Sequence, residues 1–141
     1  MKSNSIKNLF ACLAVLAGAV TLRAQSGVDI IVNESVTAAA LDKNALKDIF
    51  TGKTAYWEGG QAVTIIVLAD KTDAALEQVS GMSASQFKTH WQRLTFSGRG
   101  KQPKTIDAAD KVVEQVAQTK GAVAIVPAGT VLSGVKKIEV K

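Results

Sequence analysis

Cysteine, histidine and proline are scarce in this chain, which has 141 residues but one cysteine, one histidine and two prolines. Cys12 lies in an apolar N-terminal segment, so a chain that loses this segment has no disulfide and no thiol chemistry. His90 is the only histidine, and no His, Cys and carboxylate side chains have the spacing of a metal site. No serine stands in a nucleophile elbow and no glycine-rich phosphate loop is present. We therefore expect no enzyme activity, no cofactor and no metal.

A large excess of charge is also lacking. The formal net charge is +5, but Lys2, Lys7 and Arg23 lie in the N-terminal segment, and +5 less these three is +2. So small an excess on the remaining chain gives no basis for a nucleic-acid partner. The high isoelectric point is partly a property of the N-terminus.

The N-terminal segment has the pattern of an export signal. Lys2 and Lys7 precede an uncharged apolar run over residues 9–22, which is shorter than the roughly 20 residues of a comfortable membrane span. The small residue Ala24 follows, so we expect cleavage there, with residues 1–24 as signal peptide and residues 25–141 as one domain. An uncleaved anchor is the alternative, because Leu22 is larger than the residue usual at that place. With cleavage, the chain is periplasmic or secreted and keeps no stable membrane span.

Strands and helices are expected to alternate along residues 25–141. Apolar, β-branched runs predict strands at 28–32, 62–68, 122–126 and 135–140. Residues at helical spacing between them predict helices, of which one carries Phe87 and Trp91 on its buried stripe. The expected capping residues are Asp42, Thr72 or Asp73, Ser83 with Gln86, and Asp107. Alternation of this kind predicts an α/β fold, with a mostly parallel sheet of about four strands flanked by helices.

One stretch also carries a family resemblance. Its matching positions are Leu41, Leu46, Asp48-Ile49-Phe50, Gly52, Trp57 and Gly60. The match continues through Val63–Leu68, Phe87, Trp91, Phe96-Ser97-Gly98 and Gly121-Ala122-Val123. The chain resembles the phosphate-binding-type solute receptors of ABC transporters. This resemblance implies the fold of a type II periplasmic binding protein, in which the ligand lies between two lobes. The chain is long enough for a single lobe only.

Candidate ligand residues follow from the expected sheet. Ligands of open α/β sheets gather at the carboxyl ends of strands, here residues 33–37, 69–73 and 127–130. Ser35 and Thr37 offer hydroxyls in the first, and Lys71, Thr72 and Asp73 begin a helix in the second. Free amides at a helix start favour an oxyanion. The alternative is an ordinary capped helix start.

The resemblance bears on the second loop in particular. Phosphate receptors have a Ser-Gly-Thr-type turn at the matching point, often with an arginine before it. Residues 70–73 keep one hydroxyl and one cation, but they lack the glycine and the arginine, and they add two carboxylates that would repel a dianion.

The loop at residues 97–104 is the only local cationic cluster. Arg99 and Lys101 within it either belong to a solvated loop or contact an acidic partner or an anion. Two functions therefore stay open. One is an exported solute-binding domain that captures a small anion such as phosphate, alone or with an envelope or transporter partner. The other is a cell-envelope interaction module that has lost its ligand.

Overall fold

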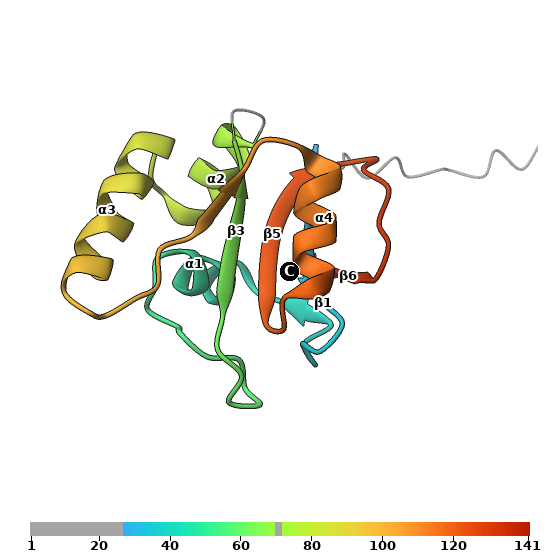
Figure 1. The fold of residues 1–141 in the computed structure, drawn as a ribbon, viewed down its shortest axis with the longest axis horizontal. Coiled ribbons are helices and arrows are strands. Elements are labelled where there is room, and N and C mark those ends of the chain that lie inside the picture. The colour runs from blue at the N-terminus through green and yellow to red at the C-terminus, as the bar shows by residue number, and fades with distance from the viewer. Residues whose placement is uncertain (1–26, 70–71) are drawn as a thin grey trace, which may run out of the picture.

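The computed structural model describes residues 27–69 and 72–141, which form ten regular elements (Figure 1). In chain order these are β1 (Val28–Asn33), β2 (Ala40–Leu41), α1 (Lys43–Phe50), β3 (Thr64–Leu68), α2 (Asp73–Ser80), α3 (Ala84–Phe96), β4 (Lys104–Ile106), α4 (Ala109–Gln118), β5 (Ala122–Pro127) and β6 (Val135–Val140). The expected signal peptide at residues 1–24 lies outside the described residues.

The strands form one sheet in the order β2-β6-β1-β5-β3-β4. The pairings β2–β6, β5–β3 and β3–β4 are parallel, whereas β1 is antiparallel to both of its neighbours. Five of the six described strands therefore run in one direction and β1 alone runs against them. The α/β class and the mostly parallel sheet are confirmed. The short strands β2 and β4 add to the four expected, since two or three residues give no readable pattern.

Both faces of the sheet are covered, because alternate residues of the central strands point to opposite sides. Ile30, Ile65 and Val123 belong to one apolar cluster with the buried residues of α1, α2 and α3. Their neighbours Ile31 and Ile66 belong to a second cluster, built with Val112, Val113 and Val116 of α4. Figure 1 shows α4 against β5 and β1, with α3 at the opposite end of the molecule. The result is a three-layer α/β/α arrangement.

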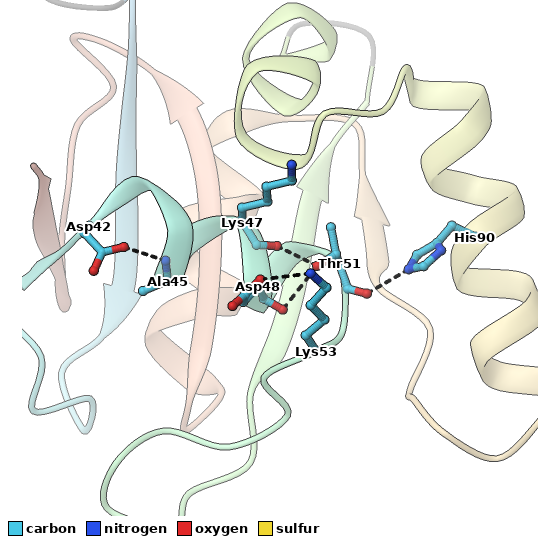
Figure 2. Close-up of polar contacts among 7 residues, drawn as sticks. All are labelled: Asp42, Ala45, Lys47, Asp48, Thr51, Lys53 and His90. Carbon is cyan, nitrogen blue, oxygen red and sulfur yellow. Dashed lines mark hydrogen bonds and ion pairs between the residues drawn. The ribbon is translucent and has the colours of Figure 1, made fainter.

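Helix α1 has the predicted N-cap and a second set of polar contacts at its other end (Figure 2). The Asp42 carboxylate accepts a hydrogen bond of 2.7 Å from the Ala45 amide, as expected of a capping aspartate. The carbonyl of Thr51, just after α1, lies 2.7 Å from Nε2 of His90. His90 thus links α3 to the end of α1, and the structure gives this histidine a packing role.

The two tryptophans are both buried and both donate to backbone carbonyls. Nε1 of Trp91 donates to the Phe50 carbonyl at 3.0 Å, and Nε1 of Trp57 donates to the Gly121 carbonyl at 2.9 Å. The adjacent Tyr56 is instead 64% exposed. Trp57 is therefore a core residue that ties the loop after α1 to the start of β5. Gly121 also allows the backbone of Ala62 to approach, since a Cβ at this glycine would clash with the Ala62 carbonyl oxygen.

Of the predicted helix caps, Asp107 is wrong and Thr72 is confirmed in position only. The N-cap position of α4 is Ala108, not Asp107, so the helix begins one residue later than its acidic residue suggests. Thr72 occupies the N-cap position of α2, but its side chain makes no capping hydrogen bond. The Ser83 and Gln86 capping box of α3 is confirmed in both of its hydrogen bonds.

Candidate functional site

The carboxyl end of β3 leads through residues 69–72 into the first turn of α2. The hydroxyl of Thr72 donates to the Leu68 carbonyl at 3.0 Å, and the residue is only 3% exposed. Its side chain therefore points back along the chain and does not cap the first turn of α2. The first-turn amides of a helix have no intrahelical partner, so this orientation leaves them to some other acceptor.

Asp73 is the other described candidate in this turn, and it is exposed at the first position of α2. A carboxylate at this position interacts favourably with the helix dipole and stabilises the helix, but it repels an anion that approaches the same amides. Lys71, the expected cation, lies outside the described residues. Two of the three predicted residues of this turn are thus adjacent, one buried and one exposed.

Ser35 and Thr37 do not share this edge of the sheet. They follow β1, which runs against β3 and β5, so they lie at the amino ends of those two strands. The Ser35 hydroxyl accepts from the Gly121 amide at 3.2 Å and donates to Oε1 of Gln61 at 3.1 Å. The expectation that residues 33–37 and 69–73 line one edge is therefore wrong, and Ser35 instead joins the starts of β3 and β5.

A pocket of about 440 Å³ opens beside the start of α2. It is bounded by the end of β3, by α2, by α3, by the loop before β4 and by β4 itself; its lining residues are Val67, Leu68, Ala69, Asp73, Leu76, Ala84, Phe87, Lys88, Trp91, Gln102, Pro103 and Thr105. Aromatic and aliphatic groups form its walls, and its charged residues are Asp73 and Lys88. Sequence reasoning missed Lys88, Gln102 and Thr105, because only the fold brings these segments together.

Arg99 and Lys101 are exposed on the loop between α3 and β4. Neither lines the pocket, although Gln102 and Pro103 of the same loop do.

The hydrogen bond that Lys111 donates to Glu114 raises the pKa of the Lys111 ammonium, but this pair lies on the exposed side of α4, across the sheet. Within residues 27–69 and 72–141, no three His, Cys, Asp or Glu side chains are grouped to hold a metal ion. No described helix is long and apolar enough to cross a membrane.

Solved structures with a similar fold were found, whereas no protein-family description and no curated protein matches the chain. A Clostridium perfringens protein, assigned as a phosphate ABC transporter substrate-binding protein and solved with bound phosphate, has a TM-score of 0.63 at 18% identity. A phosphate-binding protein from Stenotrophomonas maltophilia has a TM-score of 0.60 at 17% identity. An ABC-type phosphate transport receptor from Vibrio cholerae has a TM-score of 0.54 at 18% identity.

These matches cover 81–82% of this chain but only 44%, 39% and 46% of the three proteins, respectively. The chain therefore has the fold of phosphate-binding solute receptors over less than half of their length. This is the extent expected of a single lobe, and it confirms the fold that the motif around Asp48-Ile49-Phe50 implied.

Proposed function

We propose that the chain is an exported, single-lobe solute-binding domain that takes a small oxyanion such as phosphate at the start of α2. The observation that carries this proposal is the Thr72 side chain, which turns back to Leu68 and leaves the first-turn amides of α2 uncapped by its hydroxyl. Uncapped amides at a helix start, directly after a central strand, suit an anion. The similarity of fold to phosphate-binding receptors supports the same ligand class.

In this proposal Lys71 supplies the cation, while a partner supplies the groups that a second lobe would otherwise provide. The matched solute receptors are more than twice as long as the portion that this chain covers. A ligand bound at the edge of one lobe stays open to water on its other side. Affinity is therefore expected to be modest in the isolated domain and to rise with an envelope or transporter partner.

A second function is favoured by Asp73 and by the bond of Thr72. The exposed Asp73 carboxylate opposes a dianion, and the Thr72 hydroxyl is already engaged with a backbone carbonyl. Both features suit a cell-envelope interaction module that keeps the lobe and has lost its ligand. The two functions differ in whether phosphate binds at all.

Isothermal calorimetry with phosphate distinguishes the two functions, because it measures the phosphate affinity of variants that lose a single charge. Asp73→Asn should tighten phosphate binding roughly fivefold, because a like charge near 4 Å in water costs about 1 kcal/mol. Asp110→Asn is the matched control, since Asp110 is the first-turn acid of α4 on the other side of the sheet, and it should leave the affinity unchanged. Lys71→Ala should weaken binding roughly five- to a hundred-fold.

The outcomes separate the two functions. Phosphate binding that is indifferent to Asp73 and Lys71 would place the anion elsewhere and overturn the proposed site. Absence of binding by every variant would leave the interaction module. Thermal melts of each variant accompany the titrations, because the Asp73 carboxylate also stabilises α2 by about 0.3–1 kcal/mol through its interaction with the helix dipole.

Export is tested separately from binding. The pattern of Lys2, Lys7, the apolar run and Ala24 leads us to expect a processed chain that begins at Gln25. Intact mass and N-terminal sequencing of protein from the cell envelope measure this directly. A full-length chain in the membrane fraction would mean that the segment is an uncleaved anchor, and a full-length cytoplasmic chain would refute export.

A further inference from the structure

A span of 29 residues around α3 contains no acidic residue. Between Glu77 and Asp107 the sequence has neither Asp nor Glu, while five basic residues lie there: Lys88, Arg93, Arg99, Lys101 and Lys104. This span includes all of α3, the loop that follows it and β4. The three ion pairs formed among the described residues involve none of these five. α3 lies at one end of the molecule (Figure 1), and this helix and the loop after it supply basic but no acidic side chains there.

Phe96, the last residue of α3, is 92% exposed. On a helix of 3.6 residues per turn it lies on the same side as Arg93, three residues earlier, and away from the buried stripe of Phe87 and Trp91. A phenylalanine exposed to this extent on an otherwise polar helix face contributes nothing to the described core. It is the large apolar group of this surface.

The loop after Phe96 holds two more cations beside the helix end. The Arg99 amide donates to the Leu94 carbonyl at 2.9 Å, and a Cβ at Gly100 would lie 2.9 Å from the ring of Trp91. The loop is thus pressed against α3 while Arg99 and Lys101 remain exposed.

We name four exposed residues of the last turn of α3 and of the loop after it the α3-end surface; they are Arg93, Phe96, Arg99 and Lys101. Two other cations of the span are excluded from it. Lys88 lines the pocket together with Asp73, and Nζ of Lys104 donates to Oε1 of Gln115 at 2.7 Å.

We propose that the α3-end surface binds an anionic membrane surface, with Phe96 entering the headgroup region and the three cations beside the lipid phosphates. Basic residues beside an exposed aromatic side chain are typical of protein surfaces that bind reversibly to a membrane interface. An acidic protein partner fits less well, since a stable protein interface needs an apolar core within about 800 Å² on each side. Phe96 is the only member of the surface that provides such a core.

Co-sedimentation with lipid vesicles tests the proposal. Residues 25–141 are used, because all ten described elements and both apolar clusters lie within them and the apolar N-terminal run would itself bind lipid. Vesicles of phosphatidylcholine with phosphatidylglycerol should retain the protein, and vesicles of phosphatidylcholine alone should not. High salt should release it, because exposed charges are screened.

Two variants and two matched controls assign the binding to this surface. The triple variant Arg93→Gln, Arg99→Gln, Lys101→Gln should weaken binding roughly a hundred-fold, at about a factor of five for each charge. Phe96→Ser should weaken it roughly tenfold. The triple control Lys43→Gln, Lys111→Gln, Lys120→Gln changes the net charge equally on other parts of the surface. The control Val131→Ser makes a polar replacement of an apolar side chain that is 85% exposed elsewhere. Each control should bind more tightly than its matched variant.

Three results would overturn the proposal. The first is no retention by anionic vesicles, and the second is equal loss of binding in variants and controls. The third is binding of polyglutamate, but not of vesicles, through Arg93, Arg99 and Lys101, which would make the occupant an acidic polypeptide. Thermal melts check that each variant is folded. Phosphate affinity does not enter the measurement, so the outcome is independent of the function proposed above.

Discussion

Trp91→Ala is expected to lower the free energy of unfolding by about 3–5 kcal/mol, the range for large aromatic deletions from a core. Trp91 is 5% exposed and packs with Phe87 in the apolar cluster that the sheet forms with α1, α2 and α3. It also lies against Gly100 in the loop after α3. Its indole also donates to the Phe50 carbonyl, so truncation leaves that carbonyl without this donor. Stability of a domain of this size is about 5–15 kcal/mol in total, so a large part of it depends on this residue.

Urea denaturation of Trp91→Ala, Trp91→Phe and Phe96→Ala measures the effect and its parts. Trp91→Phe keeps an aromatic ring but removes the indole donor, and it should therefore cost less than Trp91→Ala. Phe96→Ala is the matched control on the same helix, and its 92% exposure predicts a change within about 0.5 kcal/mol. A loss of less than about 1 kcal/mol in Trp91→Ala would refute the described packing of α3.

Asn33→Ala is expected to cost about 2–4 kcal/mol, because one buried side chain satisfies three backbone groups. Nδ2 of Asn33 donates to the Val116 and Ala117 carbonyls at 2.7 and 2.9 Å, and Oδ1 accepts from the Ser35 amide at 2.9 Å. The side chain thereby joins the end of β1 to the end of α4, where the Val116 carbonyl also accepts from the Thr119 amide at 3.3 Å.

Asn44→Ala provides the comparison for this second prediction. Asn44 is exposed on α1, and alanine has the higher helix propensity, so the substitution should be neutral or slightly stabilising. Chemical denaturation of both variants gives the difference. Equal effects of the two substitutions would contradict the buried hydrogen bonds of Asn33.

Features determined by neighbouring residues were predictable from the sequence. Asp42 caps α1 and Ser83 caps α3 because the partner amide lies three residues along the chain in each case. The buried stripe of Phe87 and Trp91 followed from helical spacing. The four longer strands followed from their β-branched residues, and the motif that begins at Leu41 indicated the fold.

Features determined by distant residues were not predictable. The apolar run of β1 does not indicate the direction of the strand, which depends on pairing with the distant strands β5 and β6 near the end of the chain. For that reason Ser35 and Thr37 were expected at the wrong edge of the sheet. The hydroxyl of Thr72 can accept from an amide of the first helical turn or donate to a carbonyl, and in the fold it donates to the Leu68 carbonyl.

The pocket was missed for the same physical reason. Lys88, Gln102 and Thr105 each belong to a different segment, and none of them stands out in its own segment. Their proximity results from the packing of α3 on α2 and from the pairing of β4 with β3. The candidate site could therefore be predicted as far as the start of α2, and its surroundings only from the fold.

A phosphate titration followed by two-dimensional ¹H–¹⁵N NMR tests the central claim, that the start of α2 takes a small oxyanion, most directly. We expect saturable shifts concentrated in the amides of Thr72, Asp73, Ala74 and Ala75, because these are the N-cap and first-turn amides of α2. A chloride titration at matched ionic strength should leave them in place. No saturable shift, or shifts centred on Ser35 and Gly121 at the opposite edge of the sheet, would contradict the claim.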